Sequence, residues 1–145
     1  MNKPLHILIV EDDIISQEIL HDYLGPYGKC DVVENGKLAV HSFANAWKQE
    51  NPYHLICMDI IMPEVDGQQA LKAIRQIEKR MHIPEYQRAK VIMTSSLKDN
   101  NSILEALYDG EASRYLIKPI EYDKLIDTLK ELQLISEKIS LENEK

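Results

Sequence analysis

Reactive polar residues follow four of the five short apolar runs in this 145-residue chain. Glu11-Asp12-Asp13 follows the first run, Asp59 ends the third, Thr94-Ser95 ends the fourth and Lys118-Pro119 follows the fifth. Sites in open parallel sheets form at the carboxyl ends of the strands. We therefore expect one pocket that combines several carboxylates with a hydroxyl and a single ammonium.

This set of groups is typical of phosphoryl transfer, in which catalysis is mostly positioning and charge neutralisation. Crowded carboxylates stay ionised only when cations compensate their charge. Mg²⁺ does this well, because it favours one or two carboxylates together with water and a phosphate oxygen. Lys118 would add a point charge suited to a phosphoryl oxygen, and Thr94 would donate its hydroxyl to another.

Five apolar runs alternate with five segments of helical spacing, and both kinds of element are needed to position these residues. Continuous apolar character, as in residues 7–10, is typical of strands buried on both faces. Strict alternation predicts an α/β fold, a doubly wound five-stranded parallel sheet with helices on both faces. The predicted strands are residues 5–10, 30–34, 54–59, 90–94 and 114–117, and the helical segments are residues 15–24, 39–47, 70–81, 103–107 and 122–132.

The apolar stripes of these helices are predicted to face the core, including Ile15 and Ile19 in the first and Met81 in the third. Asp13 is expected to cap the first helix, and Gly67 to serve the turn into the third. The expected domain covers residues 1–138, followed by a charged tail at residues 139–145.

Charge and hydropathy restrict the possible partners and the location. No apolar run approaches the roughly 18 residues that span a bilayer, and the apolar start at residues 5–10 is too short for a signal peptide. We expect a cytoplasmic protein. A net charge of −7 argues against a nucleic-acid partner and against an anionic membrane surface. Proteins and small ions are the better partners.

The motifs at the strand ends, taken together, resemble the receiver domain of two-component response regulators, and most closely its stand-alone, chemotaxis-type members. They are ILIVEDD at residues 7–13, MDIIMP at 58–63, DG at 66–67, VIMTS at 91–95 and YLIKP at 115–119. The resemblance runs from about residue 5 to residue 132. It implies the flavodoxin-like strand order 2-1-3-4-5, for which a chemotaxis receiver is a known example.

The resemblance implies a role for each residue of the pocket. Asp59 matches the phosphoacceptor, a carboxylate nucleophile that forms an acyl phosphate. Asp12 matches the direct ligand of Mg²⁺, and Glu11 its acidic neighbour, which reaches the ion through water. Asp59 itself and the backbone carbonyl of Ile61 would complete the protein ligands. No residue is expected to bind any other cofactor.

Three further positions carry roles in the phosphorylated state by the same resemblance. Thr94 and Lys118 match the hydroxyl and the lysine that grip the phosphoryl oxygens. Tyr115 matches the aromatic residue whose rotamer reports phosphorylation. Lys118-Pro119 resembles the cis-proline junction of the family.

The implied function is a signalling switch of a phosphorelay and not an enzyme, since the chain would catalyse only its own phosphorylation and slow dephosphorylation. A sensor histidine kinase or a phosphotransfer protein would donate to Asp59. The phosphorylated form would change its affinity for a downstream protein at the face made by residues 103–107, 114–117 and 122–132.

Three alternatives remain open. A receiver-like scaffold that is not phosphorylated would have no need of the repulsive cluster at Glu11, Asp12 and Asp59. An aspartate-nucleophile phosphatase commonly needs a second acid two residues after the nucleophile, where this chain has Ile61. A flavin-binding electron carrier would need a phosphate-binding loop after the first strand, where three acids would repel phosphate.

Overall fold

A single parallel sheet organises the chain. The structure is a computed structural model that describes residues 4–62, 65–96 and 111–136. Its strand order is β2-β1-β3-β4-β5, which confirms the predicted fold and order. The strands are β1 (Leu5–Val10), β2 (Gly28–Val33), β3 (Leu55–Asp59), β4 (Lys90–Ser95) and β5 (Arg114–Ile117).

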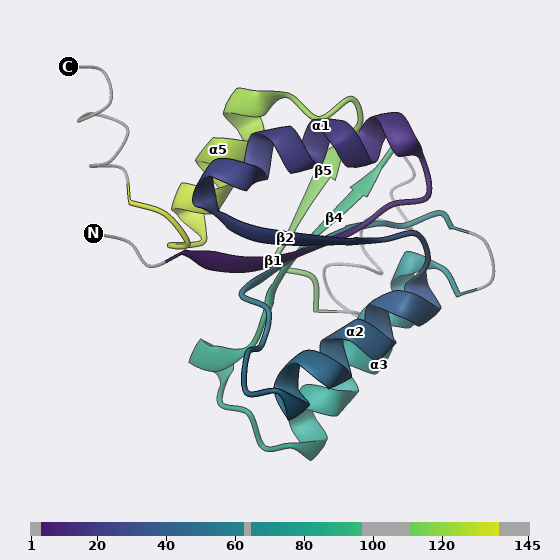
Figure 1. Cartoon of the computed structure of the whole chain (residues 1–145), viewed down its shortest axis with the longest axis vertical. Coiled ribbons are helices and arrows are strands. Elements are labelled where there is room, and N and C mark those ends of the chain that lie inside the picture. The colour runs from purple at the N-terminus through teal and green to yellow at the C-terminus, as the bar shows by residue number, and fades with distance from the viewer. Residues whose placement is uncertain (1–3, 63–64, 97–110, 137–145) are drawn as a thin grey trace.

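Four described helices cover the two faces of this sheet (Figure 1). One face carries α1 and α5, and the other carries α2 and α3. The predicted helix at residues 103–107 lies outside the described residues. The helices are α1 (Ile14–Leu24), α2 (Gly36–Lys48), α3 (Gly67–Arg80) and α5 (Tyr122–Glu131), and two short 3₁₀ turns are η1 (Gly25–Tyr27) and η2 (Glu85–Gln87). Among the described residues, no helix combines the length and the apolar character that crossing a membrane requires.

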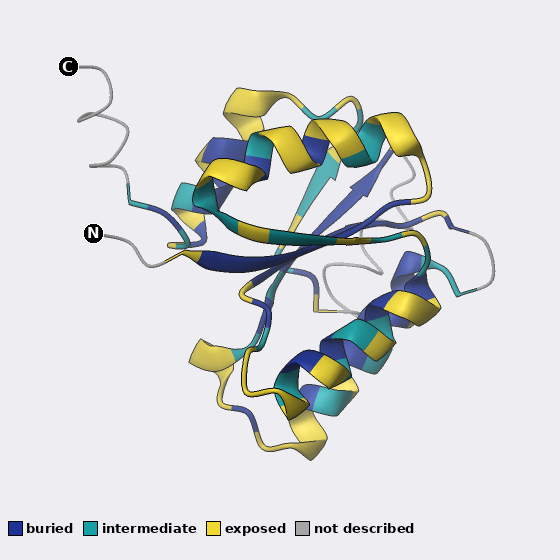
Figure 2. Ribbon diagram, in the orientation of Figure 1, coloured by how far each residue is buried: buried dark blue, intermediate teal, exposed yellow. Residues whose placement is uncertain are grey.

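The adjacent strands β1 and β3 are buried along their whole length, as Figure 2 shows for β1. Successive side chains of a strand point to opposite faces, so each strand contributes to both layers. Leu8 and Met58 pack with Phe43 beneath α2 and α3, whereas Ile9 and Cys57 pack beneath α1 and α5. Burial raises the pKa of the Cys57 thiol to about 12, as expected for an inert, buried cysteine.

The predicted strand limits were right to within two residues, and the largest difference is at β2. This edge strand begins at Gly28, where the sequence is not apolar. Gly28 pairs with Leu5, and a Cβ at position 28 would lie 2.0 Å from the carbonyl oxygen of Leu5. Only glycine therefore allows the strand to begin at this point.

Three predicted helical stripes, those of α1, α3 and α5, were partly wrong. Ile15 is 67% exposed and Ile19 is 40% exposed, so neither is a core residue of α1. The predicted core residue Leu24 is buried, and Leu20, one turn before it, forms the buried stripe with it. Met81, the C-cap of α3, and Tyr122, the first residue of α5, are also exposed, although both belong to the predicted apolar stripes.

The helices that follow β1 and β3 begin at capped residues. Asp13 accepts a hydrogen bond from the backbone N–H of Ser16 at 3.0 Å, which confirms its predicted capping role. Asp66 and Gln69 form a reciprocal capping box at α3. Gly67 opens α3 as expected, and a Cβ there would lie 2.2 Å from the carbonyl oxygen of Asp59. The reason for this glycine is therefore close packing against β3.

A polar cluster lies at the opposite, amino end of the sheet. The buried His6 ring stacks on Tyr53, with centroids 4.1 Å apart, and its Nε2 lies 3.0 Å from Asp31 Oδ2. The backbone N–H of His6 donates to His54 Nδ1 at 2.8 Å. Burial and the neighbouring His6 lower the pKa of His54. Burial opposes ionisation of Asp31, but hydrogen bonds with Tyr53 and His6 outweigh it and lower the pKa of Asp31.

His54→Asn tests the stability effect of this cluster. Because the pKa of His54 is lower in the folded chain than its ordinary value of 6.5, the unfolded chain binds more protons below that pH. The free energy of unfolding that depends on His54 is therefore fully present above pH 6.5 and falls as the pH drops below it. An asparagine Oδ1 can accept the same N–H but does not titrate. We expect the melting temperature of the wild type to fall more than that of the variant between pH 7.5 and 5.5, in thermal unfolding followed by circular dichroism. Parallel curves would contradict the role of His54, and Asp31 titrates too low to affect this range.

Candidate phosphoacceptor and metal site

The strand register brings the predicted residues to one edge of the sheet. Asp59 pairs with Thr94 across β3 and β4, and Ser95 pairs with Ile117 across β4 and β5. Two backbone hydrogen bonds continue these ladders beyond the strands, from Ile60 N–H to the Thr94 carbonyl and from Lys118 N–H to the Ser95 carbonyl, both at 2.9 Å. The positions of Asp59 and Lys118 are therefore set by the sheet itself.

Three carboxylates meet at this edge. One oxygen of each of Glu11, Asp12 and Asp59 lies within 4.8 Å of the other two. Glu11 and Asp59 are buried, with 1% and 8% exposure, whereas Asp12 is exposed. The cluster is thus anchored in the protein on one side and open to solvent on the other.

Lys118 links two of these carboxylates. Its Nζ lies 3.1 Å from Asp59 Oδ2 and also forms a hydrogen-bonded ion pair with Glu11. Burial raises the pKa of Glu11, although hydrogen bonds from Lys118 and from the Asp13 backbone act against it. Burial alone would lower the pKa of Lys118, but its contacts with Glu11 and Asp59 raise it. The lysine therefore remains an ammonium that balances buried negative charge.

The donor set fits a small divalent cation. With all groups ionised, three carboxylates against one ammonium leave an excess of two negative charges. All the donor atoms are hard carboxylate oxygens, which Mg²⁺ prefers. Asp12 is exposed, so the cluster is accessible to solvent and to an ion on this side.

Ile61 and Thr94 both lie next to Asp59. The Ile61 backbone N–H donates to Asp59 Oδ1 at 3.3 Å, and its side chain is 55% exposed at the rim. Thr94 is buried with 2% exposure beside Asp59. The structure thus brings both residues to the acceptor, and their expected contacts with metal and phosphoryl oxygens stay predictions.

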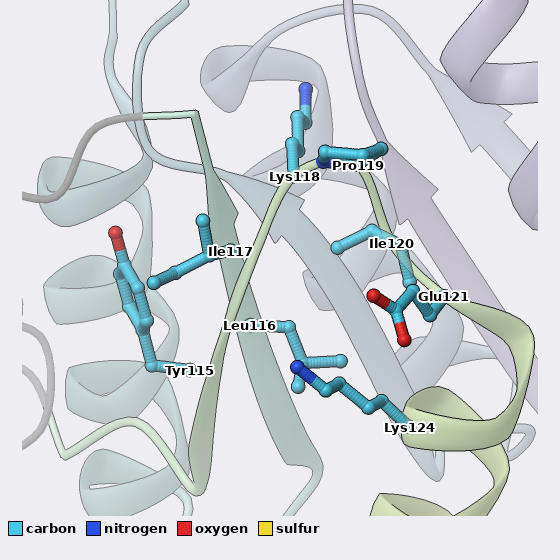
Figure 3. Close-up of a pocket in the computed structure, with 8 residues that line it drawn as sticks. All are labelled: Tyr115, Leu116, Ile117, Lys118, Pro119, Ile120, Glu121 and Lys124. Carbon is cyan, nitrogen blue, oxygen red and sulfur yellow. The ribbon is translucent and has the colours of Figure 1, made fainter.

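Tyr115 lies on the edge strand β5, three residues before Lys118. Its half-buried ring packs against the core layer beneath α2 and α3. Figure 3 shows Tyr115 and Ile117 on one side of β5, Leu116 on the other, and Lys118 extending beyond the strand. These residues line a hollow of about 410 Å³ that continues to Lys124 on α5. The Lys118-Pro119 peptide bond is cis, as expected.

Sequence reasoning missed one supporting contact and one surface. The Gln17 side chain donates to the Glu11 carbonyl at 2.6 Å, so α1 holds the end of β1 directly. A hollow of about 480 Å³ lies between Ile19 and Tyr23 of α1 and the segment Lys118-Pro119. The exposure of Ile14 and Ile15 could not be read from helical spacing, because either of two stripes on α1 could have faced the sheet.

Comparison with known proteins agrees with this geometry. Residues 7–130 match the family of the response regulator receiver domain. The chain is 33% identical to the chemotaxis protein CheY of Bacillus subtilis over 126 residues, which cover 85% of this chain and 92% of that protein.

Solved structures share the fold. The receiver domain of the Saccharomyces cerevisiae response regulator Ssk1, crystallised with the histidine phosphotransfer protein Ypd1, superposes with a TM-score of 0.76 at 28% identity, and the match covers 94% of this chain and 96% of that chain. A CheX-CheY-BeF3-Mg complex from Borrelia burgdorferi matches with a TM-score of 0.77 at 24% identity over 91% of each chain, a likeness in fold. The chain therefore belongs to the response regulator receiver domain family, whose members are signalling switches of two-component phosphorelays.

Proposed function

We propose that the chain accepts a phosphoryl group on Asp59 in the presence of Mg²⁺ and thereby changes its affinity for a partner protein. One observation carries this proposal. Lys118 bridges Asp59 and Glu11 beside an open cluster of three carboxylates, so the proposed nucleophile, a fixed cation and a metal-binding donor set lie together at one edge of the sheet.

Asp59 is the proposed nucleophile. A carboxylate oxygen of Asp59 forms a bond to the phosphorus of a phosphohistidine, while the bond from phosphorus to the imidazole nitrogen breaks and the imidazole leaves. The hydrogen bond from Ile61 N–H to Oδ1 and the ion pair of Lys118 with Oδ2 orient the attacking group. Lys118 and the Thr94 hydroxyl then hold the transferred oxygens.

Glu11, Asp12 and Asp59, with the Ile61 carbonyl, would hold the metal ion. When bound, Mg²⁺ neutralises charge on the transferring phosphoryl oxygens. The protein groups keep their own tasks: Asp12 faces solvent, whereas Glu11 is held by Lys118 and cannot turn away from the cluster without leaving a buried charge unpaired.

The proposed switch follows from competition for Lys118. In the structure its ammonium serves both Glu11 and Asp59. A phosphoryl group on Asp59 adds negative charge, which draws Lys118 and Thr94 towards the new oxygens. Lys118 directly follows β5, where Tyr115 lies, and Thr94 pairs with Leu116 of the same strand. This shift therefore biases the surface around Tyr115 and α5. The expected coupling to a partner is about 1–3 kcal/mol.

The donor is proposed to be a sensor histidine kinase or a phosphotransfer protein. In the related Ssk1 structure the receiver domain is crystallised with such a protein. Here Ile14 and Ile15, each 67% exposed, directly follow the acidic residues. The next residue, Ser16, lines the hollow between α1 and Lys118-Pro119. Exposed apolar side chains beside the site favour a protein donor that covers the opening.

The alternatives fit the geometry less well. A phosphatase of the aspartate-nucleophile type would need an acid where the exposed Ile61 lies. A scaffold would carry the cost of two buried carboxylates and one partly buried lysine without using them.

Phosphorylation by a small acyl-phosphate donor is the first test. With Mg²⁺ present, we expect the intact mass to rise by one phosphoryl group that is stable to acid and labile to base. Asp59→Asn and a chelator-treated sample should show no gain. Asp13→Asn is the matched control, because Asp13 only caps α1 and its loss should leave the modification intact. A gain that survives in Asp59→Asn would place the acceptor elsewhere, and no gain in any sample would favour the scaffold.

Ile61→Asn tests how the rim controls the lifetime of the acyl phosphate. The branched, exposed side chain of Ile61 hinders the water that must reach the phosphorus, whereas asparagine can hydrogen-bond to it. We expect the variant to lose its phosphoryl group about threefold faster or more, which corresponds to roughly 0.6 kcal/mol of barrier. Loss of the modified mass over time measures the rate. Equal decay would contradict the role of Ile61, and Leu38→Asn on α2 controls for a nonspecific surface change.

A further inference from the structure

A second concave surface lies at the amino end of the sheet, away from the carboxylates. It is a groove of about 510 Å³ formed by four separate segments. Trp47 comes from the end of α2, His54 precedes β3, Tyr86 and Arg88 belong to the η2 connection, and Leu134 follows α5. His54 is five residues before Asp59 on the same strand path, a separation of roughly 16 Å at about 3.3 Å per residue.

The charge of this groove opposes that of the chain. Among the described residues, none with a carboxylate side chain lines it, although the chain carries a net charge of −7. Arg88 and Lys90 both line it, and within residues 4–62, 65–96 and 111–136 neither forms an ion pair. His54 adds no charge near neutral pH, because its Nδ1 accepts the His6 N–H and its pKa is lowered.

A smaller hollow of about 220 Å³ on the other side of Arg88 and Lys90 contains the carboxylates of Glu85 and Glu111. Glu111 already pairs with Lys79 at 3.3 Å. Glu85 is exposed at the start of η2 and shows no ion pair in the described part of the chain. The two cations therefore remain available to a ligand in the larger groove.

The side chains of the groove are those that dominate protein interfaces. Trp, Tyr and Arg are the residue types most enriched among binding hot spots, and Trp47, Tyr86 and Arg88 supply one of each. Tyr86 is 81% exposed and Trp47 is half-buried, so both rings offer apolar surface to a ligand.

One wall of the groove is held rigidly by buried polar contacts. The fully buried Glu78 accepts the Ala89 N–H at 2.8 Å, and Arg75 donates to the Ala89 carbonyl at 2.8 Å. Arg88 Nε donates to the Ile83 carbonyl at 3.0 Å, which orients its guanidinium. A surface that is already ordered loses less entropy when a ligand binds.

We propose that this groove binds a short acidic peptide segment of a partner protein, whether or not Asp59 is phosphorylated. Carboxylates of the peptide would pair with Arg88 and Lys90, and its apolar side chains would lie on Trp47 and Leu134. Two cations suit a peptide with a few carboxylates, whereas a nucleic acid needs an extended basic surface. The inference does not depend on the proposed phosphorylation.

Binding can be measured with two pools of 12-residue peptides passed over the immobilised full chain. One pool is random in Asp, Glu, Leu, Phe, Pro and Gly, and the other has Lys and Arg in place of Asp and Glu. We expect retention of acidic peptides only. Trp47 is the only tryptophan of the chain, so retained peptides should shift its emission to shorter wavelength.

Charge reversal identifies the surface. Lys90→Glu leaves the Arg88 contact with Ile83 in place and should weaken the retained peptides about tenfold or more. Arg88→Glu with Lys90→Glu should retain the basic pool instead. Lys37→Glu with Lys124→Glu removes the same charge from exposed sites outside the groove and should bind like the wild type. Melting curves establish that each variant is folded.

Several outcomes would overturn the proposal: no retained peptide, equal loss in the control variant, or retention without a change in Trp47 emission. Stronger retention of a single-stranded oligonucleotide than of acidic peptides would point to a nucleic acid and also overturn it. The wild type with acyl phosphate and Mg²⁺, and Asp59→Asn, should bind the same peptides within about twofold. A larger difference would contradict independence from Asp59.

Discussion

The arrangement of the site depends on the ion pairs that the Lys118 ammonium forms with Glu11 and Asp59. Two carboxylates, Glu11 and Asp59, lie almost entirely out of water, and an isolated buried charge is costly. The lysine compensates both, and in doing so it ties the ends of β1, β3 and β5 together. The acidic cluster is stable for this reason, and its remaining negative charge is directed to the solvent side, where Asp12 lies.

The surrounding packing keeps this edge of the sheet in place. Gly67 allows α3 to begin against the backbone of Asp59 and Ile60, where any Cβ would clash. Gln17 of α1 holds the Glu11 carbonyl from the other face. Arg75, inside α3, donates to the Ala89 and Glu111 carbonyls, so one side chain connects the segments that precede β4 and β5. The site and the groove at the opposite end thus share one sheet but depend on different contacts.

Much of the site could be predicted from sequence because its residues follow apolar runs, and the ends of parallel strands must meet. Asp59, Thr94 and Lys118 lie where that rule places them. The rule does not extend to helix faces, where Ile15 and Leu20 belong to competing apolar stripes and only packing decides which is buried. Nor does it reach the groove of Trp47, Arg88 and Lys90, whose segments share no motif and meet only through long-range contacts.

The pairing of Lys118 with Glu11 spans 107 positions of the chain. Lys118 can pair with Asp59 only after β3, β4 and β5 have joined the same sheet. A chain still emerging from the ribosome, or one that has lost β5, carries the same aspartate without the cation that orients it. On the proposed function, the oriented phosphoacceptor therefore exists only in a chain whose sheet is complete.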